Sequence, residues 1–383
     1  MVKKISILGS TGSIGLTTLK IIKKKKNFFN INLLSANKNF KLICNQINQY
    51  KPKYFLVNDL KIFKKVKKKY QKKDIQIIND IDQIKLNNSD ITISAISGIA
   101  GLKPTINIIK STKKLLIANK ESIICGWNII KKESKKYKTK IIPLDSEHFS
   151  IMKLLENEKF KNIKKIYLTA SGGPFLNLNY KKFRRIKVKD AIFHPKWKMG
   201  KKISIDSSTL MNKMLELIEA QKLFNLPSNK LDIIIHPNSL VHAIIEFNNG
   251  LVKFLYHETS MIIPIANAIF PENLLIEKIY DKPKKNIQNL YFQKVSTKVF
   301  PVYRLKNRIN EYSSTSIIIN AANEILVDQF IQKNIPFLSI SKTIMKILND
   351  RNYKKYAIRK PKNINEITKI DNWAREITLN KLK

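Results

Sequence analysis

The sequence has little of what a secreted or membrane-spanning protein requires. It contains only two cysteines, Cys44 and Cys125, in 383 residues, too few for a disulfide framework, which predicts a reducing compartment. It has no uninterrupted apolar stretch of about twenty residues, so we expect no membrane span and no membrane partner. Hydrophobic residues still make up 43% of the chain, and this length predicts two or three globular domains.

Acidic residues are also scarce. Asp and Glu number 28 against 72 Lys and Arg, which gives a formal net charge of +44. Such a charge is typical of proteins that bind nucleic acid. Here, however, Lys, Asn and Ile are enriched together along the whole chain, which A/T-rich codons explain, and Arg and aromatic residues do not cluster. The sequence therefore predicts no specific nucleic-acid partner and only loose, salt-sensitive attraction to polyanions.

Glycine is rare as well, with ten residues, yet three of them gather near the N-terminus. Gly9, Gly12 and Gly15 follow the apolar run at residues 5–8, between a predicted strand and a predicted helix. Glycines there let the backbone approach a pyrophosphate, and free N–H groups at the helix start favour its negative charge. The alternative is a glycine-rich turn without a ligand. Because this pattern begins almost at residue 1, we expect no signal peptide and a cytoplasmic protein.

Strand and helix patterns alternate over residues 1–145, which predicts a Rossmann-like, doubly wound parallel sheet. The predicted strands are residues 5–8, 31–35, 54–57, 91–94, 115–118 and 140–143, and the predicted helices include residues 14–24 and 41–49. Asn37, Lys38 and Asn39 follow the second strand without any Asp or Glu. An acid would hold the ribose of NAD, whereas a cation favours the 2′-phosphate of NADP. We therefore interpret residues 1–145 as an NADPH-binding domain. The alternative for Lys38 is that it is one more surface lysine and contacts no ligand.

The remainder of the chain changes character twice. Extended runs at residues 164–169, 231–235, 240–247 and 251–256, with Asn248-Asn249-Gly250 as a hairpin turn, predict a central α+β catalytic domain at 146–270. Residues 271–297 are rich in lysine and contain two prolines, which favours a linker. Helical patterns at 316–332, 340–348 and 364–379 predict a C-terminal helical domain at 298–383. The expected class is α/β.

A first candidate metal site follows a predicted strand, in the stretch Asp145-Ser146-Glu147-His148. The carboxylates of Asp145 and Glu147 can converge on one point, and hard divalent cations prefer oxygen ligands. The alternative is a helix N-cap with an acidic first turn, which the same stretch fits.

A second stretch, HPKWKMG from His194 to Gly200, combines a histidine, the indole of Trp197 and a glycine. Loops that cover active sites often pair an aromatic side chain with a mobile glycine. The alternative is an ordinary loop with a partly buried tryptophan.

A third stretch, DSSTLMNKMLE, has apolar residues at helical spacing. This spacing places Asn212, Lys213 and Glu216 together on the opposite helix face. Ser207 would lie at the helix start, where an anion binds favourably. The segment is therefore interpreted as a phosphate site beside a carboxylate, or alternatively as a capped surface helix with a Lys–Glu pair.

Two shorter segments are weaker candidates for ligand contact. The turn Ser171-Gly172-Gly173-Pro174 has free backbone that could face a ligand. Asn119, Lys120 and Glu121 follow a predicted strand end, where open α/β sheets bind their ligands.

Together, the segments LGSTGSIG, LIANKES, PLDSEH, ASGGPF, HPKWKMGKKISIDSSTLMNK and NAANE occur in one order through nearly the whole chain. This series closely resembles the 1-deoxy-D-xylulose 5-phosphate reductoisomerase family. The resemblance implies a cytosolic homodimer of the non-mevalonate isoprenoid pathway that uses NADPH and Mg²⁺ or Mn²⁺. Such enzymes rearrange a phosphorylated sugar, 1-deoxy-D-xylulose 5-phosphate, to a branched aldehyde and reduce it to 2-C-methyl-D-erythritol 4-phosphate.

The same resemblance implies roles for individual residues. It assigns cofactor binding to Thr11, Gly12, Ser13, Ile14, Asn37, Lys38, Asn39, Asn119, Glu121 and Gly200. It assigns the metal to Asp145, Glu147 and Glu216. It assigns substrate contacts to Lys120, Ser146, Glu147, Ser171, His194, Trp197, Ser207, Asn212, Lys213 and Glu216. Lys120, Asp145, Glu147, His194 and Glu216 are the expected catalytic residues.

The chain departs from the family pattern at three places. Asn37 stands where glycine is usual, and asparagine is one of the residues that tolerate positive φ. Met214 replaces a usual glycine and must find room in the core, and residues 257–262 lack the usual Pro-Asp-Met-Arg. Two alternative functions remain, another two-domain NADP-linked dehydrogenase, such as one acting on an amino-acid semialdehyde, and a basic nucleic-acid-binding protein.

Overall fold

The computed structural model describes residues 2–83, 88–197, 199–272, 274–280 and 289–382, and it divides into two compact units. The first unit comprises Met1–Ser122, Asn128–Phe149 and Ser260–Lys284, and the second comprises Ile123–Trp127, Ser150–Thr259 and Lys285–Lys383. The predicted boundary after residue 145 lies close to the division at Phe149. The predicted boundary after residue 270 does not coincide with a division.

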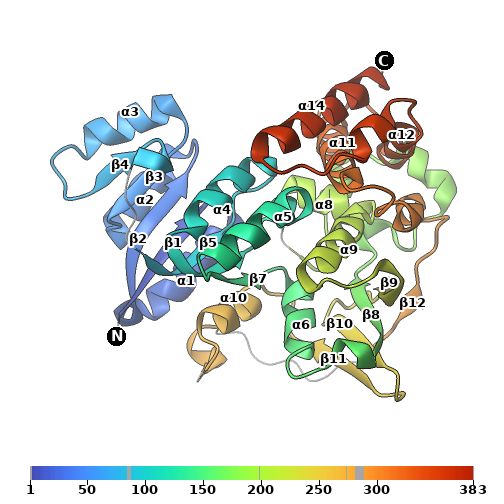
Figure 1. Ribbon diagram of the computed structural model, residues 1–383, viewed down its shortest axis with the longest axis horizontal. Helices are drawn as coiled ribbons and strands as arrows, with labels where there is room; N and C mark the ends of the chain where they lie inside the picture. Colours follow the sequence, from blue (N-terminus) through green and yellow to red (C-terminus); the bar gives the residue numbers. More distant parts are fainter. Residues whose placement is uncertain (1, 84–87, 198, 273, 281–288, 383) are drawn as a thin grey trace. The chain divides into compact units, whose positions relative to one another are not determined.

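The first unit is built on a seven-stranded parallel sheet with the strand order β4-β3-β2-β1-β5-β6-β7 (Figure 1). Its strands are β1 Lys3–Leu8, β2 Phe29–Ala36, β3 Tyr54–Val57, β4 Gln76–Ile78, β5 Ser89–Ser94, β6 Thr112–Ile117 and β7 Lys140–Pro143. Its helices are α1 Ser13–Lys24, α2 Phe40–Tyr50, α3 Leu60–Lys69, α4 Leu102–Ile109, most of α5 Lys120–Lys136, the start of α6 Ser146–Leu154 and α10 Ile262–Ile269. The six predicted strands are present, and the short β4 at the sheet edge was not predicted.

The strand order reverses between β1 and β5, because the chain runs outward from β1 to β4 and then returns to pair β5 with β1. Open α/β sheets bind their ligands at such a switch point, beyond the carboxyl ends of the strands. The middle of the sheet is fully buried, with Ile5, Ile7 and Leu8 of β1 showing no exposed area. The predicted Rossmann-like, doubly wound sheet is confirmed.

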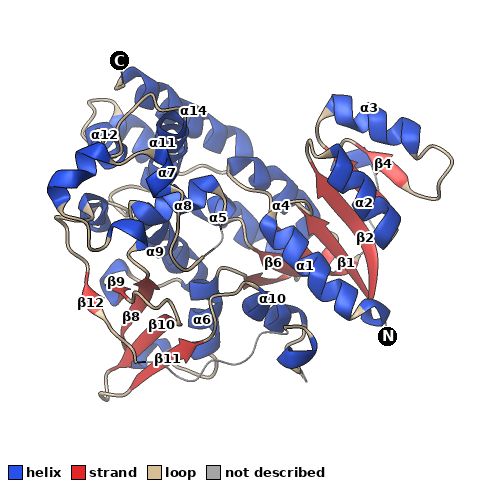
Figure 2. Ribbon diagram, turned by 180° about the vertical axis from the view of Figure 1, so that it is seen from behind, coloured by secondary structure: helices blue, strands red, loops and turns tan. Residues whose placement is uncertain are grey.

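Helix α10 packs against α1 of the first unit, although it follows the strands of the second unit in the sequence (Figure 2). Phe270 at its end packs edge-on against Phe29 at 5.5 Å and against Phe28 at 6.5 Å between ring centroids. This apolar contact explains why residues after 260 join the first unit. Of the predicted linker 271–297, residues 273 and 281–288 lie outside the described residues, and Gln293–Lys294 forms β12.

The second unit holds a mixed five-stranded sheet with the order β11-β10-β8-β9-β12. Its strands are β8 Ile163–Ala170, β9 Leu231–Ile235, β10 Val241–Phe247, β11 Val252–Tyr256 and β12 Gln293–Lys294. Its helices are α7 Val188–Ala191, α8 Lys201–Ser208, α9 Met211–Phe224, α11 Thr315–Ile331, α12 Ser339–Leu348, α13 Tyr353–Ala357 and α14 Ile364–Asn380. The predicted hairpin turn joins β10 to β11.

Helix α9 packs on β8 and β9, and α11 packs against α14, α12 and α8 (Figure 1). The α/β class with a parallel N-terminal sheet, a central α+β region and C-terminal helices is confirmed. Met214 shows no exposed area in α9, as expected of a methionine that must fit the core. Among the described residues, no helix has the length and apolar character to cross a membrane.

Candidate functional site

The glycine turn between β1 and α1 forms a narrow backbone cradle. Gly9 has a φ of +84°, and a Cβ placed on it would lie 2.6 Å from the carbonyl oxygen of Ala95. A Cβ on Gly15 would lie 2.6 Å from the Cα of Ser10. No side chain caps the N-terminus of α1 at Gly12, so its first N–H groups remain available to an anion. The turn therefore requires glycine at Gly9 and Gly15. After Gly12, the start of α1 offers backbone N–H donors.

The turn is anchored by hydrogen bonds from the residues around it. Ser10 N donates to Ser35 O at 2.8 Å, and Ser10 Oγ donates to Gln46 Oε1 at 2.6 Å. Gly9 N donates to Ser35 Oγ at 2.9 Å. Strand β2 and helix α2 thus hold the turn in place. Beyond them Thr11, Gly12, Ser13 and Ile14 are at least partly exposed.

The segment after β2 carries the predicted cofactor residues Asn37, Lys38 and Asn39, all exposed. Asn39 caps α2, where its Oδ1 accepts from Leu42 N at 3.1 Å. Asn37 is not among the described non-glycine residues with positive φ. Asparagine at this position therefore does not serve a left-handed backbone conformation, contrary to the expectation from the sequence.

Asn119 caps the N-terminus of α5 and ties the end of β6 to the segment that follows β5. Its Nδ2 donates to Ile96 O at 2.6 Å and to Gly98 O at 3.0 Å, and its Oδ1 accepts from Ser122 N at 2.8 Å. The same amide donates to Glu121 Oε2 at 3.0 Å. Asn119 and Glu121 are buried, so this pair fixes the backbone at the carboxyl end of β6.

Asp145 lies directly before α6, beside a lysine. Lys120 Nζ lies 3.4 Å from Asp145 Oδ2, and Asp145 Oδ1 accepts from Glu147 N at 3.2 Å, as an N-cap residue does. Ser146 Oγ donates to Glu147 Oε2 at 2.6 Å. His148 Nδ1 lies 3.3 Å from Asp145 Oδ1. The sequence analysis gave helix capping and a pair of carboxylates as alternative interpretations of this segment. The structure has Asp145 as a helix cap with the carboxylate of Glu147 two residues later.

The segment DSSTLMNKMLE forms the junction of two helices. Helix α8 ends at Ser208, Leu210 has a left-handed φ of +67°, and α9 begins at Met211. The prediction that Ser207 begins the helix is wrong, because Ser207 lies in the last turn of α8. The left-handed Leu210 breaks the apolar periodicity that runs across both helices.

The first turn and a half of α9 brings together the half-buried amide of Asn212, a buried cation and a buried carboxylate. Lys213 Nζ donates to Glu216 Oε2 at 2.7 Å, and Asn212 Nδ2 donates to Glu216 Oε1. Lys213 is 8% exposed and Glu216 is 1% exposed. The predicted spacing is confirmed, but the alternative of a surface helix is wrong, because this Lys–Glu pair is buried.

His194 is buried next to the same group and is held in one tautomer. Its Nδ1 accepts from Lys196 N at 3.1 Å and from Trp197 N at 3.0 Å. Its Nε2 lies 2.9 Å from Ser171 Oγ, and with Nδ1 accepting, Nε2 carries the proton and donates. Burial, with a further effect of the Lys213 charge, lowers the pKa of His194 to about 4. The imidazole is therefore neutral near pH 7.

The turn after β8 packs onto the end of α8. A Cβ on Gly173 would lie 3.1 Å from Ser207 O, and Gly173 N donates to Ser171 Oγ at 3.0 Å. Within the second unit, Ser171 thus contacts His194, Asn212 and Lys213 contact Glu216, and the turn after Ser171 packs on the backbone of Ser207.

The loop after His194 leads into α8. Lys198 of this loop lies outside the described residues. The indole of Trp197 meets the ring of His242 edge-on at 6.1 Å between centroids. Gly200 occupies the N-cap of α8, with nothing within 4 Å of a Cβ placed on it, so the backbone there is open.

Two polar groups near this site were not predicted. Asp206 of α8 is 1% exposed and accepts from Lys202 Nζ at 2.9 Å and from Asn323 Nδ2 at 2.8 Å. The segment NAANE was the only sequence signal for Asn323. His242 of β10 stacks on His257, the residue after β11, at 3.7 Å between ring centroids, a contact that no local pattern indicated.

Comparison with known families accounts for most of the chain. The family profile described as 1-deoxy-D-xylulose 5-phosphate reductoisomerase matches residues 5–126. Two profiles for C-terminal domains of the same enzyme match residues 141–224 and 257–377. Among curated relatives, the 1-deoxy-D-xylulose 5-phosphate reductoisomerase of Pelagibacter ubique (strain HTCC1062) is 48% identical over 97% of both chains. That of Wolbachia sp. subsp. Drosophila simulans (strain wRi) is 41% identical over 89% of both.

Solved structures agree over the whole length. A crystal structure of DOX-P reductoisomerase in complex with NADPH, fosmidomycin and magnesium superposes with a TM-score of 0.90 at 30% identity, covering 100% of this chain and 98% of the other. The reductoisomerase from Zymomonas mobilis in complex with NADPH gives a TM-score of 0.89 at 29% identity, covering 100% of both chains.

Proposed function

Since this chain belongs to the 1-deoxy-D-xylulose 5-phosphate reductoisomerase family, we propose which of its residues bind the ligands and carry out the reaction. The chain is an NADP-dependent, metal-dependent enzyme of isoprenoid precursor synthesis, and it rearranges and reduces 1-deoxy-D-xylulose 5-phosphate to 2-C-methyl-D-erythritol 4-phosphate. The observation that supports the residue roles is the buried pair of Lys213 and Glu216, bonded to the half-buried Asn212, together with the contact of His194 with Ser171.

NADPH is proposed to lie with its phosphates over the glycine turn. The steric limits at Gly9 and Gly15 support this, because a Cβ would fill the cradle that a pyrophosphate needs. Thr11, Gly12, Ser13 and Ile14 would contact the phosphates, Asn37, Lys38 and Asn39 would lie near the adenosine ribose, and Asn119, Glu121 and Gly200 would line the rest of the site. When bound, NADPH supplies the hydride for the reduction.

Asp145, Glu147 and Glu216 are proposed as the ligands of one Mg²⁺ or Mn²⁺. The donor set fits, because three carboxylates supply only oxygen ligands. Lys120 lies against Asp145 and Lys213 against Glu216, so each of these two carboxylates has a cation beside it. When bound, the metal ion polarises hydroxyl and carbonyl oxygens of the substrate.

The substrate phosphate is proposed to bind Ser171, Ser207, Asn212 and Lys213. A buried ammonium with hydroxyl and amide donors around it is a suitable partner for a dianion. His194 donates from Nε2 toward Ser171 Oγ and would keep that hydroxyl oriented toward the phosphate. Lys120, Ser146 and Glu147 would contact the sugar oxygens.

The loop from His194 to Gly200 is proposed to close over the substrate. Two backbone N–H groups of the loop bind His194 Nδ1, so the position of the loop start depends on a neutral imidazole. Trp197 would then cover the substrate and exclude water, which protects the intermediate aldehyde until it is reduced.

We further propose that the protein is a cytoplasmic homodimer. Strand β11 lies at the edge of its sheet and exposes apolar side chains along its length, with Leu251 at 61%, Val252 at 56% and Phe254 at 49% exposure. An exposed apolar edge strand favours pairing with another chain. Light scattering should give twice the mass of one chain, and a monomeric mass would contradict the proposal.

The function is tested by following NADPH oxidation on addition of 1-deoxy-D-xylulose 5-phosphate, with and without Mg²⁺. We expect turnover only when the substrate and the metal are both present. Turnover of an amino-acid semialdehyde without metal would instead support the alternative dehydrogenase.

A further inference from the structure

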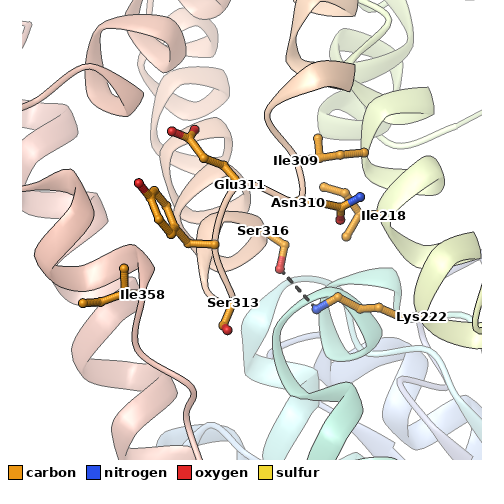
Figure 3. Close-up of a pocket in the computed structure, with 9 residues that line it drawn as sticks. Ile218, Lys222, Ile309, Asn310, Glu311, Ser313, Ser316 and Ile358 are labelled. Atoms are coloured by element: carbon orange, nitrogen blue, oxygen red, sulfur yellow. Dashed lines mark hydrogen bonds between the residues drawn. The ribbon is translucent and has the colours of Figure 1, made fainter. Parts of the chain in front are cut away.

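A cavity of about 470 Å³ lies beside the C-terminal half of α9, away from the residues assigned to the reaction (Figure 3). Lys222 of α9 and Ser316 of α11 line it, together with the isoleucines Ile218, Ile309 and Ile358. The volume is in the range of small-molecule sites. All of these residues belong to the second unit.

Lys222 makes two hydrogen bonds, both to neutral groups. Its Nζ donates to Ile124 O at 2.6 Å and to Ser316 Oγ at 3.2 Å, and Ser316 Oγ in turn donates to Ile124 O at 3.2 Å. An ammonium group has three N–H donors. Two are therefore used, and one remains on a side chain that lines the cavity.

Among the described residues, no carboxylate pairs with Lys222. Burial lowers the pKa of Lys222 from 10.5 to about 8, opposed only by the nearby thiol of Cys125. At pH 7 the amine is thus still mostly charged, without a counter-charge. A buried charge without a partner is costly and favours any ligand that supplies one.

The acidic residue at the cavity, Glu311, does not serve as that partner. Its carboxylate lies 2.7 Å from Arg308 and accepts from Tyr353 Oη at 3.3 Å. Figure 3 shows this carboxylate turned away from Lys222. In contrast, the side chains of Asn310 and Ser313 line the cavity without a hydrogen bond to any described residue, so their polar atoms are available to a ligand.

We propose that this cavity binds a short-chain monocarboxylate, with its carboxylate on Lys222 and its alkyl group against Ile358. A single cation matches a single negative charge, whereas a phosphate dianion would leave one charge unpaired in the cavity. Ile358 is 53% exposed and offers apolar surface on which an alkyl group can be buried, whereas Ile218 and Ile309 are themselves buried and form the apolar wall behind it. Asn310 and Ser313 supply donors at the cavity mouth.

The test measures the reactivity of individual lysines. Trace acetylation at pH 8, read out by peptide mass spectrometry, reports the neutral fraction of each amine. The acetylation rate of Lys222 should rise with a midpoint near pH 8, and its neutral fraction at pH 8 should exceed that of a lysine with the ordinary pKa of about 10.4 by about a hundredfold. The exposed Lys342 serves as the reference lysine. Saturating isovalerate should slow the acetylation of Lys222 at least fivefold, because a bound anion stabilises the charged amine. The acetylation rate of Lys342 should not change.

Isovaleramide, which has the same shape without the charge, is the matched probe. Equal protection by isovaleramide, or none by isovalerate, would overturn the proposal, and so would protection by inorganic phosphate alone.

Calorimetry gives a second readout. Isovalerate should bind the wild-type protein and the Lys342→Gln variant with equal affinity, and its affinity for the Lys222→Gln variant should be at least tenfold lower. Unchanged binding to Lys222→Gln would place the anion elsewhere. Catalytic turnover does not enter either readout, so the outcome is independent of the proposed reaction.

Discussion

The two units, each proposed to bind a phosphate group, do so with different kinds of groups. The first unit offers backbone, a turn in which Gly9 and Gly15 exclude any side chain and α1 begins without a cap. The second unit offers buried side chains, with Lys213 at 8% exposure in contact with Glu216 at 1%. Lys38, the cation proposed for the first unit, is exposed.

This difference has a physical consequence. Among substitutions, only proline removes a backbone N–H group, so the first unit is sensitive to added volume rather than to lost side-chain charge. A buried ion pair is sensitive to loss of either partner, because the remaining charge is left without compensation. Substitutions should therefore act through sterics in the first unit and through charge in the second, and four predictions test this contrast.

The largest effect is expected for Glu216→Gln, which keeps the size of the side chain and removes one charge. Turnover should fall at least about a hundredfold, since a metal ligand contributes several kcal/mol to the transition state. The NADPH dissociation constant should stay within about twofold. Glu376→Gln on the exposed face of α14 is the matched control, and equal turnover of both variants would refute the role of Glu216.

Lys213→Ala should weaken substrate binding by about ten- to a hundredfold, since a hydrogen bond to a charged group contributes about 1.5–3 kcal/mol. Binding of NADPH should be unaffected when each ligand is titrated separately. The control is Lys222→Ala on the same helix, which should leave KM for the substrate unchanged. A loss confined to NADPH would show that the α9 lysine serves the other ligand.

Gly15→Ala should destabilise the protein by about 1–3 kcal/mol, because the added Cβ meets backbone that cannot move away. Gly12→Ala is the control, since the nearest atom to its Cβ is Gly9 O at 3.4 Å, and its unfolding midpoint should match the wild type. Chemical denaturation measures both. Equal midpoints for the two variants would mean that the turn is not sterically limited.

The smallest effect is expected for Lys38→Ala, because this side chain is exposed and its contact is screened by solvent. The ratio of kcat/KM for NADPH to that for NADH should fall about five- to tenfold. Lys41→Ala, on the exposed first turn of α2, should leave the ratio unchanged. A wild-type enzyme that used both cofactors equally would remove the basis of this prediction.

Sequence patterns predicted the first unit well, because its strands are short apolar runs between helices and each pattern is local. They did not place α10 with the first unit, since that depends on contacts of Phe270 with residues far away in the chain. They also placed the start of a helix at Ser207, whereas Ser207 lies in the last turn of α8 and α9 begins at Met211. The left-handed backbone of Leu210 separates the two helices, and the apolar spacing does not reveal it.

In the functional regions too, sequence patterns predicted contacts within one helix but not contacts between helices. The spacing of Asn212, Lys213 and Glu216 along one helix was sufficient to predict their contact. The environment of Lys222 was not predictable in this way, because its partners come from α5 and α11. Burial of a lysine without a carboxylate is a property of three packed helices and has no signature in the sequence around residue 222.

The central proposal is that Asp145, Glu147 and Glu216 hold one divalent cation, and Mn²⁺ binding followed by electron paramagnetic resonance tests it most directly. The wild-type protein should bind one Mn²⁺ per chain in competition with Mg²⁺. Asp145→Asn, Glu147→Gln and Glu216→Gln should each weaken that binding at least about tenfold, because each removes one anionic oxygen ligand. Undiminished Mn²⁺ binding by Glu216→Gln, together with weakened binding by the other two variants, would contradict the shared site.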